Sequence, residues 1–267
     1  MTRVVVTGAA SGIGNATAAR LVAAGHEVVS LDIKEPQTAV ASHVPCDMSD
    51  PAAIDSALSR LEGTFGSLLN IAGVPGRSGA ENTIRVNTLG LRHLTDALWD
   101  RIDDGGTVVN VSSIAGNQWK RRQELHQAIL ETPDFGSGLE WWTENEATVG
   151  VDAYTFSKEA VVLYTMYLAG RGLSRGIRCN DVGPGPVDTP ILPDFAHDVG
   201  ETQMQWMVDQ IGRPATPDDI AEVLVLLAGD TCKWINGQHI IVDGGLTSGL
   251  QSRWIDTSTS PLRQRKR

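Results

Sequence analysis

Short runs of apolar and β-branched residues alternate with longer stretches of helical periodicity along most of the chain. The spacing of apolar side chains predicts helices over residues 15–24, 51–61, 83–101, 154–171 and 217–228. The alternation predicts an α/β fold, a single doubly wound Rossmann domain with a parallel seven-stranded sheet and helices on both faces. The runs that predict strands are RVVV (3–6), EVVSL (27–31), HVPC (43–46), SLLNIAG (67–73), TVVNVSS (107–113), GIRCNDV (176–182) and QHIIVDGG (238–245).

Residues 116–150 interrupt this alternation. They contain two stretches of helical character, NQWKRRQELHQAILE and LEWWTENEA, but no convincing strand. Leu125 and Ile129 form an apolar pair one helical turn apart. We interpret the segment as a helical insertion over the carboxyl edge of the sheet, before the helix that begins at Tyr154. The domain then spans residues 1–250, and residues 251–267 form a C-terminal tail.

Composition and charge argue against several classes of protein. The net charge of −10 disfavours a nucleic-acid binder, because phosphate backbones need a basic protein face. The basic end, RQRKR, is interpreted as a solvated tail. The three cysteines and six histidines lack metal-ligand spacing, so we expect no metal and reduced thiols. No apolar run reaches the length of a membrane span, and we expect a cytoplasmic protein without membrane contact.

A glycine-rich turn, TGAASGIG, follows the first predicted strand. Its glycines, at positions 8, 12 and 14, follow the spacing G-x-x-x-G-x-G and not the common G-x-G-x-x-G. Such a turn lets backbone N–H groups and a helix N-terminus approach a pyrophosphate, although glycine-rich turns also serve purely structural ends. The second strand ends at Asp32, whose carboxylate can accept both ribose hydroxyls and would repel a 2′-phosphate. NAD is therefore expected over NADP.

Tyr154 and Lys158, in the sequence YTFSK, lie one helical turn apart. Hydride transfer from an alcohol leaves a proton to remove, and a phenol with a pKa of about 10 is a weak base at neutral pH. A nearby ammonium favours the phenolate, although such a pair also fits an ordinary amphipathic helix. Ser112 and Ser113 end a predicted strand, where successive side chains point to opposite faces, so only one can donate a hydrogen bond to a substrate oxygen.

Together these motifs resemble the short-chain dehydrogenase/reductase family. The resemblance extends from Val4 to about Leu246 and rests on TGAASGIG, CDMSD, NIAG, VNVSS, YTFSK, PGPVDT and WINGQHIIVDGG. It implies that Tyr154 is the general acid/base, that Lys158 lowers its pKa and binds the nicotinamide ribose, and that Ser113 polarises the substrate oxygen. The resemblance also implies that Asn87, within a predicted helix that asparagine does not favour, holds a water linking Lys158 to solvent.

The same resemblance implies a set of cofactor contacts. Asp47 and Met48 would border the adenine, the segment Asn70, Ala72 and Gly73 would lie along the adenosine ribose, and Val187 with Thr189 would hold the nicotinamide carboxamide. Ile71 stands where the family usually repeats asparagine, which puts a sheet contact in doubt more than the chemistry. The complete expected set is Gly8, Ser11, Gly12, Ile13, Gly14, Asp32, Asp47, Met48, Asn70, Ala72, Gly73, Tyr154, Lys158, Pro184, Gly185, Val187 and Thr189.

The interval between Ser113 and Tyr154, 41 positions, is longer than is typical of the family. With NIAGVPG and WINGQHIIVDGG it narrows the resemblance to the subgroup that contains bacterial 3α-hydroxysteroid dehydrogenase/carbonyl reductase and coniferyl-alcohol dehydrogenase. Trp119, Trp141 and Trp142 of the insertion either roof an apolar or aromatic substrate or anchor the insertion to the domain. The segment after PGPVDTPIL, through Trp206 and Met207, resembles the mobile substrate loop of the family.

These features predict an NAD-dependent oxidoreductase that interconverts a hydrophobic alcohol, such as an aryl allylic alcohol or a hydroxysteroid, and its carbonyl. Two alternatives stay open: a 3-oxoacyl-thioester ketoreductase, and a catalytically silent NAD-binding regulatory protein. Family members usually assemble through the helix that carries the tyrosine, and the insertion lies close to that helix in sequence. We therefore expect a homodimer through the C-terminal helix and strand, with a homotetramer as the alternative.

Overall fold

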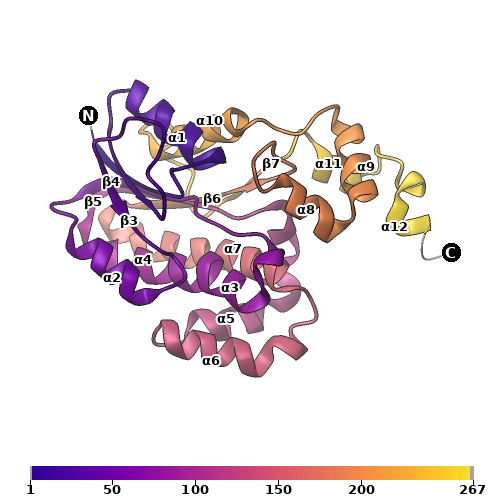
Figure 1. Cartoon of the computed structure of the whole chain (residues 1–267), viewed down its shortest axis with the longest axis horizontal. Helices are drawn as coiled ribbons and strands as arrows, with labels where there is room; N and C mark the ends of the chain where they lie inside the picture. Colours follow the sequence, from indigo (N-terminus) through magenta and orange to yellow (C-terminus); the bar gives the residue numbers. More distant parts are fainter. Residues whose placement is uncertain (1, 265–267) are drawn as a thin grey trace.

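Seven parallel strands form one sheet in the order β3-β2-β1-β4-β5-β6-β7 (Figure 1). The computed structural model describes residues 2–264, so residues 265–267 of the basic end lie outside the described residues. All seven predicted strands are confirmed. The strand order reverses between β1 and β4, a switch point of the kind where doubly wound sheets bind ligands. The strands are β1 (Arg3–Thr7), β2 (Glu27–Asp32), β3 (Ser42–Pro45), β4 (Phe65–Asn70), β5 (Ile102–Val111), β6 (Arg178–Pro184) and β7 (His239–Val242).

Helices cover both faces of the sheet, as the doubly wound prediction requires (Figure 1). Helices α1 and α10 pack over apolar strand residues such as Val4, Val6 and Val109. Helices α2, α4 and α7 cover the opposite face, over Val5, Leu68 and other core residues. The helices are α1 (Gly12–Ala23), α2 (Pro51–Ser59), α3 (Ala80–Ile84), α4 (Leu91–Leu98), α5 (Gln123–Leu130), α6 (Phe135–Asn145), α7 (Ala153–Gly172), α8 (Leu192–Val199), α9 (Glu201–Ile211), α10 (Pro217–Ala228), α11 (Leu246–Ser252) and α12 (Pro261–Gln264).

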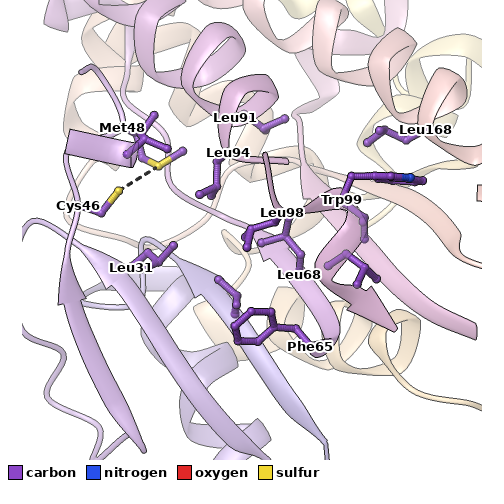
Figure 2. Close-up of a cluster of buried hydrophobic side chains, with 14 of the residues drawn as sticks. Leu31, Cys46, Met48, Phe65, Leu68, Leu91, Leu94, Leu98, Trp99 and Leu168 are labelled. Carbon is purple, nitrogen blue, oxygen red and sulfur yellow. Dashed lines mark hydrogen bonds between the residues drawn. The ribbon is translucent and has the colours of Figure 1, made fainter. Parts of the chain in front are cut away.

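The core between the sheet and α4 is shown in Figure 2. Leu94 and Leu98 of α4 pack with Leu68 of β4, and each such buried side chain stabilises the fold by about 1.5–3 kcal/mol relative to exposure. Cys46 and Met48 belong to the same cluster, with their sulfurs 3.9 Å apart. Burial raises the pKa of the Cys46 thiol to about 11, so the thiol stays protonated and unreactive. This packing holds the chain that follows β3 at the carboxyl edge of the sheet.

The helix predicted over residues 83–101 is continuous but irregular. Between α3 and α4 the chain makes a π-helical turn, Arg85–Gly90, and Asn87 lies within it. A side chain at Gly90 would meet the carbonyl oxygen of Met48 at 2.0 Å from its Cβ, so only glycine permits this close approach. Single π-helical turns are often found at functional sites, which gives the disfavoured asparagine a structural context.

The insertion forms a further layer against the outer faces of α3 and α7 (Figure 1). Phe156 of α7 lies beneath it, with ring centroids 5.3 Å from Trp142, 6.0 Å from Trp141 and 4.5 Å from His126. We expected this segment over the carboxyl edge of the sheet. The insertion instead packs on α7 through its aromatic side chains. Only the part near Trp142 and Glu146 reaches the carboxyl edge of the sheet.

The segment predicted as a C-terminal tail is packed in its described part. The indole N–H of Trp206, in α9, donates to the Thr259 hydroxyl at 3.0 Å, and the Ser260 hydroxyl donates to the Gln203 side chain at the same distance. Helix α12 follows at Pro261. Residues 259–262 of the segment expected as a tail thus contact α9, and the boundary expected at residue 250 stays a prediction.

Candidate active site

A cavity of about 1450 Å³ lies at the carboxyl ends of the strands, beside the point where the strand order reverses. This volume exceeds the ~300–1,000 Å³ of common small-molecule pockets, so it has room for a dinucleotide together with a substrate. Most of the residues expected from the sequence line its wall. They are Gly8, Ser11, Gly12, Ile13, Gly14, Asp32, Asp47, Met48, Ala72, Gly73, Ser113, Tyr154, Lys158, Pro184, Gly185, Val187 and Thr189.

The glycine-rich turn at one end of the cavity depends on close backbone contact. A Cβ on Gly14 would lie 1.9 Å from the carbonyl oxygen of Gly8, so a side chain there would force the turn open. Gly8 itself has a φ of 71°, a left-handed conformation that favours glycine. The N-cap of α1, Ser11, makes no side-chain hydrogen bond to the described first turn of that helix. The first N–H groups of α1 are thus free to bind a pyrophosphate.

Asp32 joins the end of β2 to the glycine-rich turn. One carboxylate oxygen accepts the N–H of Ala10 and the other accepts the N–H of Lys34, both at 2.9 Å. Each oxygen keeps a free lone pair for a ribose hydroxyl. Glu35 lines the same part of the cavity, and the sequence alone did not single it out. Two carboxylates at this position make a poor environment for a 2′-phosphate.

Asn70 is placed differently from the other expected cofactor residues. It is 1% exposed, and its amide donates to the Thr95 hydroxyl at 2.9 Å and to the Asn110 side chain at 2.8 Å. These bonds connect β4 to α4 and β5, away from the cavity wall. The sheet contact that Ile71 put in doubt is therefore supplied by Asn70, and Ile71 lines the cavity.

Ser113, Tyr154 and Lys158 meet in the middle of the cavity. Ser113 follows the end of β5, where its hydroxyl accepts the N–H of Ala115 and is also hydrogen-bonded to Tyr154. Tyr154 lies in the first turn of α7, and the Lys158 ammonium is 5.7 Å from the centre of the Tyr154 ring. The same ammonium donates to the carbonyl of Val111 at 3.0 Å. The insertion has left this geometry intact despite the long interval in sequence.

Burial shifts both titratable groups of this trio. It raises the pKa of Tyr154 to about 12, against the opposing effect of the hydrogen bond with Ser113. It lowers the pKa of Lys158 to about 8, against the opposing charge of Asp181. Tyr154 is therefore a phenol in this state, ready to donate a proton, while Lys158 titrates close to neutral pH.

Asn87 lies behind the cavity wall. Its amide oxygen accepts the N–H of Val74 at 2.9 Å, and its amide nitrogen donates to the Val74 carbonyl and to the Ser157 hydroxyl. A Cβ built on Gly73 would lie 3.3 Å from the Asn87 side chain and 3.4 Å from the Lys158 ammonium. Asn87 thus holds the loop after β4 beside Lys158, and the water expected at Asn87 stays a prediction.

The remaining wall comes from the insertion and from α8 and α9. Trp141 and Trp142 of the insertion both pack on Phe156, as the anchoring alternative proposed, and Trp142, which is 1% exposed, also borders the cavity. Phe195 of α8 lies over Tyr154 with ring centroids 5.0 Å apart. Met207 also lines the cavity, in the segment expected to form the substrate loop. No sequence pattern pointed to Phe195 beyond its place in that loop.

The part of the chain that the structure describes holds no group of three or more histidine, cysteine, aspartate or glutamate side chains suited to a metal ion. Within residues 2–264, no helix is both long enough and apolar enough to span a membrane.

Comparisons with known proteins agree with this geometry. Residues 2–125 match the family described as short chain dehydrogenase, and residues 141–247 match the one described as Enoyl-(Acyl carrier protein) reductase. Coniferyl-alcohol dehydrogenase of Pseudomonas sp. is 38% identical over 92% of this chain and 96% of its own. The 3-alpha-hydroxysteroid dehydrogenase/carbonyl reductase of Comamonas testosteroni is 29% identical over 94% of this chain and 98% of its own.

A solved structure shows the same likeness. The 3-alpha-hydroxysteroid dehydrogenase from Pseudomonas sp. B-0831, complexed with NADH, superposes with a TM-score of 0.79 at 28% identity, covering 94% of this chain and 99% of its own. The fold agrees with that of this relative. The chain belongs to the short-chain dehydrogenase/reductase family, and it is an alcohol/carbonyl oxidoreductase.

Proposed function

We propose that the protein is an NAD-dependent alcohol dehydrogenase that also catalyses the reverse reduction of the carbonyl. The observation that carries this proposal is the meeting of Ser113, Tyr154 and Lys158 on the wall of a cavity whose other end holds Asp32. A substrate oxygen between the Ser113 hydroxyl and the Tyr154 phenol would have one fixed hydrogen-bond donor and one group that exchanges its proton.

In the oxidation direction, Tyr154 as phenolate takes the hydroxyl proton of the alcohol while the carbinol carbon loses a hydride. The oxidised nicotinamide, when bound, accepts that hydride and contributes a positive charge. Ser113 donates a hydrogen bond to the substrate oxygen throughout, and Lys158 stabilises the phenolate by its charge. In the reduction direction the Tyr154 phenol, which burial keeps protonated by raising its pKa to about 12, returns the proton to the carbonyl oxygen, and the charge of Lys158 stabilises the phenolate that is left.

The proposed cofactor preference rests on the carboxylates at the end of β2. Asp32 and Glu35 both line the adenosine end of the cavity, where a 2′-phosphate would add two negative charges. Lys34 and Glu35 line the cavity with exposed side chains of opposite charge, both screened by solvent, so the preference rests mainly on the less exposed Asp32. The related 3-alpha-hydroxysteroid dehydrogenase structure contains NADH, which supports the same choice.

The proposed substrate is a hydrophobic alcohol, either an aryl allylic alcohol or a hydroxysteroid. The cavity beside Tyr154 is walled mainly by apolar side chains. These are Ile114, Trp142, Val151, Ile191, Leu192, Phe195, Met204 and Met207. The names of two relatives, coniferyl-alcohol dehydrogenase and 3-alpha-hydroxysteroid dehydrogenase/carbonyl reductase, support this class of substrate.

The runner-up is a 3-oxoacyl-thioester ketoreductase, favoured by the match of residues 141–247 to a family of acyl-carrier-protein reductases. The net charge of −10 opposes it, because an acidic carrier protein would be repelled. A catalytically silent regulatory protein would have no need of the complete Ser113, Tyr154 and Lys158 trio.

The test is a spectrophotometric screen of NAD and NADP reduction against steroid, terpenoid and aryl allylic alcohols, with a 3-hydroxyacyl thioester as the competing substrate. We expect NAD reduction with at least one hydrophobic alcohol and little with NADP. Faster turnover of the thioester would support the runner-up, and no turnover with any substrate would support the regulatory alternative.

We also propose a cytoplasmic homodimer formed through α10 and β7. Trp234, before β7, is 99% exposed and Leu226 of α10 is 49% exposed, so this edge of the sheet presents apolar surface. The insertion covers the outer face of α7, the alternative place for such a contact. Light scattering that returned the mass of a monomer would contradict this assembly.

A further inference from the structure

A cluster of three polar side chains lies beneath the catalytic trio, and of the three only Ser112 reaches the cavity wall. Asp181 of β6 and His239 of β7 are register partners in the sheet, and Ser112 follows the end of β5 beside them. The Ser112 hydroxyl donates to Asp181 Oδ1, and His239 Nδ1 lies 2.9 and 3.0 Å from the two carboxylate oxygens. Asp181 and His239 are absent from the described cavity wall.

The carboxylate of Asp181 is fully buried, and the His239 side chain is 10% exposed. A buried charge is costly unless donors surround it, and here the Ser112 hydroxyl and the His239 ring N–H supply them. Space for the ring is built into the strand, because a Cβ on Gly183 would lie 2.5 Å from His239 Cε1. The sheet therefore accommodates an aspartate and histidine pair that the reaction described above does not use.

The composition of serine, histidine and aspartate does not make this cluster a hydrolytic triad. In such a triad the histidine Nε2 accepts the serine proton while the aspartate holds Nδ1. Here the Ser112 hydroxyl donates to the carboxylate itself, and His239 Nε2 is buried without a hydrogen-bond partner among the described residues. The hydrogen-bond donors of the cluster are instead arranged around the buried Asp181 carboxylate.

The cluster is linked to Lys158 through a single strand end. Lys158 donates to the carbonyl of Val111, the residue directly before Ser112, and Ser113 follows directly after it. Asp181 is the charge that opposes the effect of burial on Lys158, whose pKa is lowered to about 8. Without a counter-charge, a buried ammonium with a pKa near neutral would lose its proton in the pH range where the enzyme must use it.

Building on the proposed function, we propose that Asp181, hydrogen-bonded to Ser112 and His239, is a positioning residue whose carboxylate is the counter-charge of the Lys158 ammonium beneath the sheet surface. Ser112, directly after β5, and His239 of β7 are hydrogen-bonded to Asp181, whereas Lys158 of α7 interacts with it through charge and is hydrogen-bonded to the Val111 carbonyl next to Ser112. Replacing Asp181 by asparagine keeps the shape and removes the charge. The ammonium then loses its proton at lower pH, and Tyr154 loses its cationic neighbour at pH values where the wild type keeps it.

The test measures Lys158 directly, in the protein without cofactor or substrate. The chain has only five lysines, so NMR of protein labelled with ¹³C at lysine Cε resolves few signals, and Lys158→Arg identifies the one of interest. We expect a wild-type midpoint near 8 and a midpoint lower by about one pH unit in Asp181→Asn, the lower end of what loss of a neighbouring charge produces. An unchanged or higher midpoint overturns the proposal.

Glu159→Gln is the matched control. Glu159 is also a fully buried carboxylate and directly follows Lys158, but its oxygens face Arg122 and His126 in the insertion. This variant should leave the Lys158 midpoint unchanged, and an equal shift would show that any buried carboxylate near α7 has the effect. If Asp181→Asn alone does not fold, the double variant Asp181→Asn/His239→Gln replaces the pair by two amides that can bond to each other.

A kinetic readout extends the test to turnover. The deficit of Asp181→Asn in kcat for alcohol oxidation should be small near pH 6, where Lys158 is protonated in both proteins, and should grow to about fivefold at pH 8. A deficit that does not change with pH means a merely structural role and overturns the proposal. The NMR midpoint does not depend on dehydrogenase activity, so a failure of the proposed function is seen separately, as a wild type that oxidises no alcohol.

Discussion

Arg122→Leu removes the cation that ties the insertion to α7. In the structure, both nitrogens of the Arg122 fork bind the Glu159 carboxylate, at 2.5 and 2.7 Å, and His126 binds it from the other side at 2.9 Å. Glu159 and His126 are fully buried, and the Arg122 side chain is 16% exposed. The variant therefore leaves a buried carboxylate with one of its two partners.

Breaking a buried pair from one side typically costs about 3–5 kcal/mol, because the remaining charge is uncompensated. His126 still donates in the variant, so we expect the lower end, about 3 kcal/mol. For a domain of this size that corresponds to a fall in Tm of roughly 6–12 °C. Arg121→Leu is the matched control: Arg121 is the preceding residue, it is exposed, and its loss should change Tm little.

The direction in which the stability of the protein changes with pH follows from the pKa of Glu159. Burial alone would raise its pKa, but hydrogen bonds from His126 and Arg122 outweigh burial and hold the pKa below the ordinary value of 4.5. A depressed pKa gives stability that is present above 4.5 and is lost as pH falls through the lower folded value. The difference between wild type and Arg122→Leu should be largest near neutral pH and should narrow on acidification.

The assay is guanidinium unfolding followed by circular dichroism and by tryptophan fluorescence, since Trp141 and Trp142 report on the insertion itself. A fluorescence transition that precedes the circular dichroism transition in Arg122→Leu would show that the insertion detaches first. A loss of less than about 1 kcal/mol at pH 7, equal to that of Arg121→Leu, would refute the reasoning, because it would mean that the buried pair contributes no more than a surface pair.

Two further variants test the ends of the cavity. Gly14→Ala places a Cβ 1.9 Å from the Gly8 carbonyl oxygen and should weaken NADH binding in a fluorescence titration by at least about tenfold, whereas Gly136→Ala, where the nearest atom is 3.5 Å away, should not change it. Trp142→Phe should raise KM for the preferred alcohol by about fivefold with kcat nearly unchanged, since the loss of part of one aromatic wall costs about 1 kcal/mol. Trp141→Phe should not, because Trp141 lies outside the described cavity wall, and equal effects of the two variants would contradict the placement of Trp142.

The sheet was readable from the sequence because parallel strands buried on both faces appear as continuous apolar runs. The first five residues of β5 were missed, since Asp103, Asp104 and the two glycines after them carry no apolar signal. The helix over residues 83–101 was predicted in extent but not in form. Its π-helical turn depends on Gly90 meeting the backbone of Met48, a contact between residues 42 positions apart.

The candidate site was readable to the extent that its residues occur in short motifs. Ser113, Tyr154 and Lys158 were expected from VNVSS and YTFSK, and the structure brings them together on the cavity wall. Asp181 and His239 were read only as parts of two strands, because their partnership joins positions 58 residues apart. Motif reasoning placed Asn70 at the cofactor, whereas its side chain spans the sheet.

The position of the insertion on the domain could not be predicted from the sequence either. Its amphipathic pattern showed that one face would be buried but not against which surface. That choice depends on Phe156 and Glu159, which lie on the outer side of α7 and receive the aromatic and cationic side chains of the insertion. The amphipathic pattern of the insertion does not show which other helix will cover its apolar face.

The most direct test of the central claim is Tyr154→Phe, assayed for both turnover and NADH binding. The variant keeps the ring that packs against Phe195 and removes only the hydroxyl that is hydrogen-bonded to Ser113. We predict that NADH binding, measured by fluorescence titration, is unchanged, while kcat for the preferred alcohol falls by about 10²–10⁴-fold, the usual contribution of a general acid/base. A variant that turned over the alcohol at the wild-type rate would contradict the assignment of Tyr154 as the group that carries the proton.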